Sequence, residues 1–441
     1  MFNKNNNLTI KTKVLVGASA ATLMAAFGSG YIAQAQGPEI EAEASLTVDY
    51  ETGQILQGNE IDKPLGIASM TKMLAEYIVF EELEAGTMDW DTEVIISQYA
   101  YETSQDYSLS NVPLRNGEMY TLRELYEAMA IYSANGATIA IAEAIEGSEP
   151  AFVDRMRTLV ETFGIEDAYL VNSTGLNNSD LRGNIYPDSA SDDENSMSAR
   201  SVAKITNRIV TDYPEILETA SLPRLTFRED TVDAIDMVNW NMMLEGLLLE
   251  RPGVDGLKTG TTDYAGSTFT GTAKQGDRRV ITVVLNSGEG MTTRFIETDK
   301  MMDFGFDNFS MQDVTSAWED SGDYEPLTVV NGKEDLLDYE VSEELEMLIQ
   351  LGDVPEEELT FTIEWDKNII SSDGSIEAPI LKGVELGRLV ANYSGNELGY
   401  LDAATETSVP LMAKNDVEKA GIFQQLWNGI VSLFNNIKSR F

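Results

Sequence analysis

The fold is decided by residues 253–285, GVDGLKTGTTDYAGSTFTGTAKQGDRRVITVVL. Three strand-like runs lie in this stretch, over 253–262, 267–273 and 279–285. Glycine and polar turn residues separate them, and Gln275-Gly276-Asp277 joins the last two closely enough for a hairpin. The stretch therefore predicts neighbouring strands of an antiparallel sheet.

The beginning of the chain predicts more of this sheet. Residues 44–49 alternate in polarity, and a turn at Glu51-Thr52-Gly53 leads into a second short run over 54–57, which indicates a hairpin. Between this hairpin and the strands, apolar residues recur at helical spacing in four segments: 69–84, 121–132, 148–164 and 198–211. Strands, then helices, then strands again predict an α+β domain with one sheet built from both chain ends and a helical subdomain between them.

This first domain is expected over residues 36–312, and further segments follow it. The acidic stretch 313–325 predicts a linker, and short strand-like runs over 326–413 predict a small all-β domain. Residues 417–441 predict a C-terminal amphipathic, membrane-binding helix. Its apolar side chains repeat every four residues and amide side chains occupy the other face, the main apolar stripe being Ile422, Leu426, Ile430 and Phe434.

The first 35 residues have the pattern of a signal peptide. Their positive start is formed by three lysines: Lys4, Lys11 and Lys13. An apolar run of small residues over 14–27 follows, and Ala33-Gln34-Ala35 supplies an A-x-A cleavage site. We therefore expect an exported protein whose mature chain begins near Gln36. An uncleaved membrane anchor is the alternative, because Gly-rich apolar runs can be retained.

Composition excludes several classes of function. The chain contains no cysteine and no histidine, so a thiol nucleophile, a Ser-His-Asp triad and a His- or Cys-ligated zinc site are all impossible. A net charge of -44 argues against nucleic acid as a partner, because phosphates demand a basic surface. The plainer interpretation of the charge is a solvated acidic coat. We expect no cofactor and no metal, and any base must be another side chain.

A possible nucleophile lies at Ser69-Met70-Thr71-Lys72, an S-x-x-K pattern. Ser201-Val202-Ala203-Lys204 matches the same pattern but falls inside a predicted helix, where a serine usually faces solvent or bonds to the preceding turn. Ser69 is expected at a helix start, where free backbone N–H groups and the positive end of the helix can face an anion. The i, i+3 spacing then places Lys72 on the same face as Ser69. Considered alone, Ser69 is equally well explained as an N-cap serine with a purely structural role.

Two more motifs follow in order. Ser133-Ala134-Asn135 is an S-x-N pattern after a predicted helix, and Ser394-Gly395-Asn396 repeats the pattern in the β-rich region. Lys258-Thr259-Gly260 occurs once, on a strand-like run. A lysine and a hydroxyl on an edge strand can bind a carboxylate, and glycine permits another backbone to approach. Alone, each motif reads as a turn or a polar strand end.

Together, S-x-x-K, S-x-N and K-T-G in this order form the signature of penicillin-binding proteins and class A β-lactamases. From about residue 41 to 412 the chain resembles the low-molecular-weight D-Ala-D-Ala carboxypeptidases, peptidase family S11. The resemblance implies a β-lactamase/transpeptidase-like domain and a following β domain. Asn172-Ser173-Thr174-Gly175-Leu176 looks like a further family segment. The chain departs from the family pattern at Gly136, where Asp is frequent, and in lacking a histidine before Met197.

The expected mechanism is acyl transfer from a peptidoglycan stem peptide ending in D-Ala-D-Ala. Serine needs an adjacent base, and a neutral Lys72, its pKa depressed by burial and by Lys258, is the candidate for activating Ser69. Ser133 would relay the proton to the leaving amine, and Asn135 would orient the substrate amide. The resemblance implies an oxyanion hole at the N–H groups of Ser69 and Thr261. The substrate-binding residues would be Thr259, Gly260, Thr261 and Arg294, with Thr259 and Arg294 on the terminal carboxylate.

Expected partners are the stem pentapeptide, β-lactams as inhibitors and the outer surface of the cytoplasmic membrane, reached through the C-terminal helix. Three alternatives stay open on the sequence. A β-lactamase would need a deacylating glutamate, usually in an E-x-x-L-N segment, and none lies between Asn135 and Lys258. A DD-transpeptidase differs only in the nucleophile that resolves the acyl-enzyme. A catalytically silent cell-wall binding protein has no physical reason to keep all three motifs intact.

Overall fold

The computed structural model describes residues 11–13, 37–288, 290–319, 324–352, 359–402 and 407–421. The chain divides into two compact units: one of Gln36–Asn308 with Leu398–Ala404, and one of Phe309–Glu397 with the remaining segments. None of the helices within the described ranges is long and apolar enough to cross a membrane. Apart from 11–13, the expected signal peptide lies outside the described residues.

The first unit contains a five-stranded antiparallel sheet in the order β10-β11-β12-β2-β3. Its strands are β10 (Val254–Thr262), β11 (Gly266–Gln275), β12 (Arg278–Leu285), β2 (Ala44–Asp49) and β3 (Ile55–Asn59). Val283 of β12 stands opposite Leu46 of β2, so the two ends of the domain meet in the centre of the sheet. The predicted sheet is confirmed, and β10, which carries the K-T-G motif, is an edge strand.

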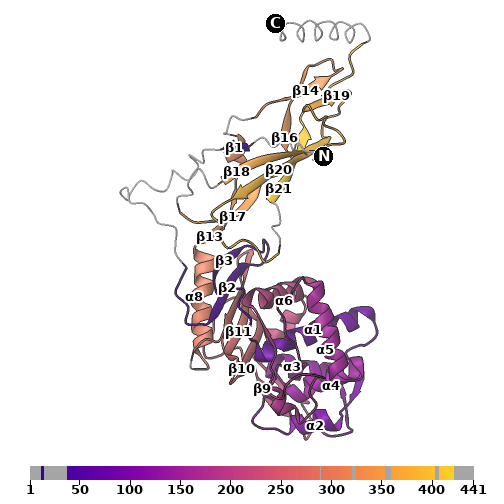
Figure 1. Ribbon diagram of the computed structural model, residues 1–441, viewed down its shortest axis with the longest axis vertical. Helices are drawn as coiled ribbons and strands as arrows, with labels where there is room; N and C mark the ends of the chain where they lie inside the picture. Colours follow the sequence, from indigo (N-terminus) through magenta and orange to yellow (C-terminus); the bar gives the residue numbers. More distant parts are fainter. Residues whose placement is uncertain are drawn as a thin grey trace, which may run out of the picture. The chain divides into compact units, whose positions relative to one another are not determined.

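Helices cover both faces of this sheet (Figure 1). α8 (Thr293–Asp307) packs on one face, and α6 (Ala199–Asp212) lies on the other with the helical subdomain beyond it. The sequence pattern predicts α6 but not α8. The reason is that the buried face of α8 includes the charged residues Arg294 and Glu297, so no continuous apolar stripe marks it. Its apolar core contacts are supplied by Phe295, Met301 and Met302.

The helical subdomain follows the local signals in the sequence. α3 (Leu122–Tyr132) begins with a complete capping box between Thr121 and Glu124, and Ser148 caps α5 (Glu149–Thr162). α4 (Asn135–Glu146) was not predicted. The remaining elements are α1 (Lys72–Ala85), α2 (Gln98–Ser104), α7 (Ile216–Ala220), η1 (Ala68–Thr71), η2 (Asn178–Leu181), β4 (Leu65–Gly66), β5 (Glu93–Ile95), β6 (Met119–Thr121), β7 (Ser196–Met197), β8 (Arg224–Phe227) and β9 (Ile235–Val238).

The second unit is mainly β-structure around a core of its own. One sheet has the order β1-β18-β20-β21-β16, and smaller sheets pair β13 with β17 and join β15, β14 and β19. The strands are β1 (Lys11–Lys13), β13 (Phe309–Asp313), β14 (Leu327–Val330), β15 (Leu336–Leu337), β16 (Tyr339–Val341), β17 (Glu346–Gln350), β18 (Leu359–Trp365), β19 (Ser375–Glu377), β20 (Glu385–Tyr393) and β21 (Thr407–Ala413).

The expected boundaries differ from the structure in three places. The stretch 313–325 is not a linker where the structure describes it, because α9 (Thr315–Glu319) buries Ala317 and Trp318 in the core of the second unit. Residues 398–404 belong to the first unit, where Leu401 is buried. Residues 417–421 are not helical: Val417 is buried and forms a bridge with Ile380. The rest of the predicted C-terminal helix, 422–441, lies outside the described residues.

Candidate active site

Ser69 lies in η1, the single 3-10 turn that leads directly into α1. The prediction of a helix start is therefore confirmed. Two glycines let other backbones approach this turn. A Cβ on Gly175 would lie 1.8 Å from the Ala68 carbonyl oxygen, and a Cβ on Gly260 would lie 2.7 Å from that of Ile67. Ala68 itself has a φ of 45°, a conformation that costs free energy outside glycine, so the turn before Ser69 is held by its surroundings.

The Lys72 side chain is fully buried and its Nζ contacts three oxygen atoms. It lies 2.9 Å from Ser69 Oγ, 2.8 Å from Asn135 Oδ1 and 2.7 Å from the Thr174 carbonyl oxygen. The carbonyl oxygen of Thr174 can only accept a hydrogen bond. The Asn135 amide nitrogen donates to the Ser110 carbonyl oxygen, which fixes Oδ1 as the other acceptor. Two N–H groups of Lys72 are therefore committed to these two oxygens.

Burial, followed by the charge of Lys258, holds the pKa of the Lys72 ammonium well below its usual range. Glu76 and Glu149 act in the opposite direction. A neutral amine has two N–H groups and one lone pair. With both N–H groups donated to Asn135 and Thr174, the lone pair remains to accept the hydroxyl proton of Ser69. The geometry thus suits the neutral base that the sequence predicts.

Ser133 and Lys258 form the second half of the arrangement. Ser133 ends α3 in the left-handed conformation, with a φ of 58°, and its hydroxyl accepts a hydrogen bond of 3.0 Å from Lys258 Nζ. Lys258 also donates to the Thr259 carbonyl oxygen. Burial lowers the pKa of Lys258 to about 8, with Glu76 opposing the shift and Arg294 adding to it.

The end of β10 gathers the predicted substrate-binding residues. Thr259 and Gly260 are buried in the strand, and Thr261 follows them. Arg294 of α8 donates from Nη1 to the Gly260 carbonyl oxygen at 2.8 Å and to Thr261 Oγ1 at 2.8 Å. Burial lowers the pKa of Arg294 to about 10. The guanidinium of Arg294 therefore contacts β10 through its Nη1 nitrogen, which is already hydrogen-bonded to Gly260 and Thr261.

A loop that the sequence marked only by resemblance completes the site. Thr174 presents its carbonyl oxygen to Lys72 because Asn172 Oδ1 accepts hydrogen bonds from the N–H groups of Thr174 and Gly175. Buried Glu149 accepts from both the N–H and the hydroxyl of Ser173. Asparagine clusters next to glycine were the available signal for this turn, but no local pattern indicates its distant lysine partner.

The departure at Gly136 has a steric reason in this chain. A Cβ there would lie 2.7 Å from Ser104 Cβ and 2.8 Å from the Ala100 carbonyl oxygen, so α4 packs directly against α2. Asn111 Oδ1 accepts from the Gly136 N–H. The second S-x-N pattern, Ser394 to Asn396, lies in the second unit, after β20.

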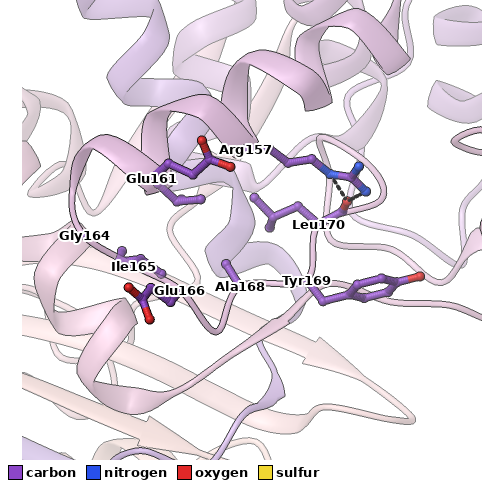
Figure 2. A pocket seen from close by; sticks show the side chains of 9 residues that line it. Arg157, Glu161, Gly164, Ile165, Glu166, Ala168, Tyr169 and Leu170 are labelled. Carbon is purple, nitrogen blue, oxygen red and sulfur yellow. Dashed lines mark hydrogen bonds between the residues drawn. The ribbon is translucent and has the colours of Figure 1, made fainter.

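A pocket of 580 Å³ is lined by α5 and by the segment that precedes the loop of residues 172–176 (Figure 2). It is separate from the candidate active site. Arg157 of α5 lines the pocket and donates from Nε to the Leu170 carbonyl oxygen at 2.9 Å. Tyr169 and Glu161 also line this pocket. None of the predicted catalytic residues contributes to its wall. The Arg157 contact holds the segment that leads into residues 171–176.

Comparison with known proteins gives consistent results. Residues 32–289 match the family Peptidase S11, D-alanyl-D-alanine carboxypeptidase. The chain is similar to the D-alanyl-D-alanine carboxypeptidase DacF of Bacillus subtilis (strain 168), with 29% identity over 381 residues that cover 86% of this chain and 87% of the relative.

Solved structures agree with this match. The crystal structure of a peptidoglycan synthesis regulatory factor (PBP3) from Streptococcus pneumoniae superimposes with a TM-score of 0.69 and 36% identity, covering 86% of this chain and 100% of that chain. Penicillin-binding protein D2 from Listeria monocytogenes in its ampicillin-bound form gives a TM-score of 0.51 and 27% identity, covering 62% of this chain and 100% of that chain. Since the family match spans more than half of the 441 residues, this chain belongs to the D-alanyl-D-alanine carboxypeptidases of peptidase family S11.

Proposed function

We propose that Ser69 is the nucleophile of a serine-type D-Ala-D-Ala carboxypeptidase that removes the terminal D-alanine from peptidoglycan stem peptides. One observation carries the assignment of the base: Lys72 Nζ has two obligate acceptors and Ser69 Oγ within 2.9 Å, and no carboxylate of the described residues forms an ion pair with it. The amine is therefore free to take the serine proton.

The proposed reaction has two steps, acylation of Ser69 and deacylation by water. In acylation, Lys72 Nζ accepts the proton of Ser69 Oγ while Oγ attacks the carbonyl carbon between the two D-alanines. The C–N bond breaks, and the proton reaches the leaving amine through the Ser133 hydroxyl, which Lys258 orients. In deacylation, Lys72 accepts a proton from water, the resulting oxygen nucleophile attacks the ester, and Ser69 Oγ leaves with the proton.

Charge develops on the carbonyl oxygen during both steps. The N–H groups of Ser69, at the start of η1, and of Thr261, on edge strand β10, would stabilise it. Asn135 is held between Lys72 and Ser110, so its remaining amide hydrogen would orient the substrate amide. Thr259 and Thr261, with the charge of Arg294 behind Thr261, would hold the terminal carboxylate.

A fluorescent penicillin and a D-Ala-D-Ala peptide test the proposal together. We expect covalent labelling of the protein and release of one D-alanine per peptide. Fast recovery from the penicillin with no release of D-alanine would instead show a β-lactamase. Labelling with transfer to an added amine in place of water would show a transpeptidase. No labelling at all would contradict the assignment of Ser69.

Arg294 offers a test of carboxylate recognition. Arg294→Gln removes the positive charge behind Thr261, so hydrolysis of a D-Ala-D-Ala peptide should fall by roughly 10- to 100-fold in kcat/KM. An ester analogue that lacks the terminal carboxylate should lose much less. Equal losses on both substrates would show that Arg294 serves only to hold α8 against β10.

The location of the enzyme is also a proposal. The signal-peptide pattern of the first 35 residues supports export, and the apolar stripe that begins at Ile422 supports peripheral attachment to the outer face of the cytoplasmic membrane. Because Val417 and Ala420 are buried, the informative truncation is one after Gly421. We expect the truncated enzyme to keep its activity and to stay in the supernatant when the full-length chain pellets with anionic liposomes. Pelleting of both proteins would contradict the attachment.

A further inference from the structure

A three-residue segment outside the catalytic set, Asn239-Trp240-Asn241, follows β9 and contacts both the end of α3 and β10. Both asparagines are buried and hold the backbone of the segment. The Asn239 amide nitrogen donates to the carbonyl oxygens of Ala220 and Leu222. Its Oδ1 accepts from the Asn241 N–H at 2.9 Å. Trp240, which is half-buried, therefore projects from a backbone that is fixed on both sides.

Trp240 caps the last carbonyl group of α3. Its indole Nε1 donates to the Tyr132 carbonyl oxygen at 3.0 Å, and the two aromatic rings pack with their centroids 5.9 Å apart. Tyr132 is the last residue of α3, and the final carbonyl groups of a helix have no partner inside the helix. The indole therefore satisfies an oxygen that the helix cannot, and it fixes the peptide group that joins Tyr132 to Ser133.

Ser133 needs such support because of its backbone conformation. Its φ of 58° lies in the left-handed region, which costs free energy in a residue other than glycine. On the opposite side of the segment, Asn241 Nδ2 donates to the Gly256 carbonyl oxygen at 3.2 Å, two residues before Lys258 on β10. The segment thus contacts both stretches of chain that bring Ser133 Oγ and Lys258 Nζ within 3.0 Å of each other.

We propose that Trp240 is a positioning residue for proton transfer to the leaving group: its hydrogen bond to Tyr132 holds the Ser133 hydroxyl against Lys258. This inference rests on the proposed function, in which Ser133 passes the proton to the leaving amine. An amine leaves only when its nitrogen gains that proton, so breakage of the C–N bond depends on where the hydroxyl lies. A thiolate leaves without a proton, and the proton that Lys72 accepted passes to solvent instead. The two kinds of leaving group therefore report separately on the proton relay and on the nucleophile.

Trp240→Phe tests the proposal, because it keeps an aromatic ring against Tyr132 and removes the N–H donor. We expect kcat/KM for a D-Ala-D-Ala peptide to fall by roughly 10-fold, since the relay is misplaced. For the thioester analogue with sulfur in place of the leaving nitrogen, kcat/KM should change by less than about threefold. Ser133→Ala should show the same preference with a larger loss on the peptide, since it removes the relay itself.

The matched control is Trp90→Phe, the same change at a tryptophan whose ring packs on Phe80 with centroids 6.0 Å apart. It should leave kcat/KM for both substrates within about twofold, and thermal unfolding checks that each variant folds. Equal losses on the two substrates in Trp240→Phe, or no loss on the peptide, would overturn the inference. Equal losses in Ser133→Ala would instead contradict the relay in the proposed function, so the two failures are distinguishable.

Discussion

Ser69–Lys72 and Ser201–Lys204 share the S-x-x-K pattern, and both lie in the first turns of a helix. Their surroundings differ in every other respect. Ser201 donates its hydroxyl to Asp167 Oδ1, whereas Ser69 Oγ faces an amine. Lys204 pairs with the carboxylate of Asp402 at 3.0 Å, whereas Lys72 is enclosed by amide, carbonyl and hydroxyl oxygens.

The difference shows which surroundings the proposed nucleophile and base have and the second S-x-x-K pattern lacks. A lysine beside a carboxylate is stabilised in its charged form and has no reason to release a proton. A lysine that is buried with no carboxylate in hydrogen-bond contact, and that is repelled by a second lysine, is shifted toward its neutral form. The pattern supplies the side chains at the right spacing, but the partners contributed by distant segments decide the chemistry.

The largest expected effect on the rate of acylation comes from removal of the proposed nucleophile, Ser69. Ser69→Ala should reduce acylation and D-alanine release by roughly 10⁴-fold or more, because the covalent step has no substitute. Ser201→Ala should keep the wild-type rate and lose only about 1 kcal/mol of stability through its hydrogen bond. Intact-protein mass after penicillin treatment checks both. An adduct that persists in Ser69→Ala and vanishes in Ser201→Ala would show that Ser201, and not Ser69, is the nucleophile.

Exchange of the lysines gives the next effect in size. Lys72→Arg should lower acylation by roughly 10³-fold, since arginine keeps its proton and cannot act as base. Lys204→Arg should stay within about twofold, because an arginine also pairs with a carboxylate. In the wild type, acylation should fall as pH drops through the lowered pKa of Lys72, because protonation occupies its lone pair. Stopped-flow acylation rates across pH measure this, and an active Lys72→Arg would exclude lysine as base.

A smaller effect is expected from the backbone contact that sets the Ser69 turn. Gly175→Ala places a methyl group 1.8 Å from the Ala68 carbonyl oxygen at a φ of 77°, so the turn must shift. We expect a rate loss of roughly 10- to 100-fold from misplacement of the serine. Gly147→Ala, at a φ of 78° with no atom within 4 Å, is the matched control and should cost about 1 kcal/mol of stability without loss of rate. Equal rates in the two variants would show that the contact does not position Ser69.

The smallest effect is expected from the ion pair of the second S-x-x-K pattern, between Lys204 and Asp402. Lys204→Met removes the contact with Asp402, whose side chain is 66% exposed, and keeps the apolar stem of the lysine. Such partly exposed pairs contribute about 0–1 kcal/mol, so the melting temperature should change little and acylation not at all. Thermal unfolding and penicillin labelling check this. A large loss of labelling would mean that the second pattern supports the site after all.

Much of the fold follows from local signals. The hairpin of β2 and β3, the three strands of residues 254–285 and the capped start of α3 obey short-range rules of alternation, turn residues and caps, which operate within a few residues. α4 and α8 escape prediction because no clear apolar stripe marks either one. α4 is buried along most of its length, and α8 depends on the sheet that it covers. The expected linker fails for a related reason: its acidic residues hide Trp318, whose burial depends on strands that follow it in the chain.

For the site, the sequence by itself determined which side chains are available. The absence of histidine predicts a lysine base, and the order of the three motifs predicts a site made of Ser69, Lys72, Ser133, Asn135 and Lys258. Tertiary structure alone decided that Thr174 accepts from Lys72, that Arg294 donates to both Gly260 and Thr261, and that Oε1 of Glu76 is buried without a partner among the described residues. The physical reason is that protonation depends on burial and on charges brought together from α1, α5, β10 and α8, and no spacing along the chain encodes those distances.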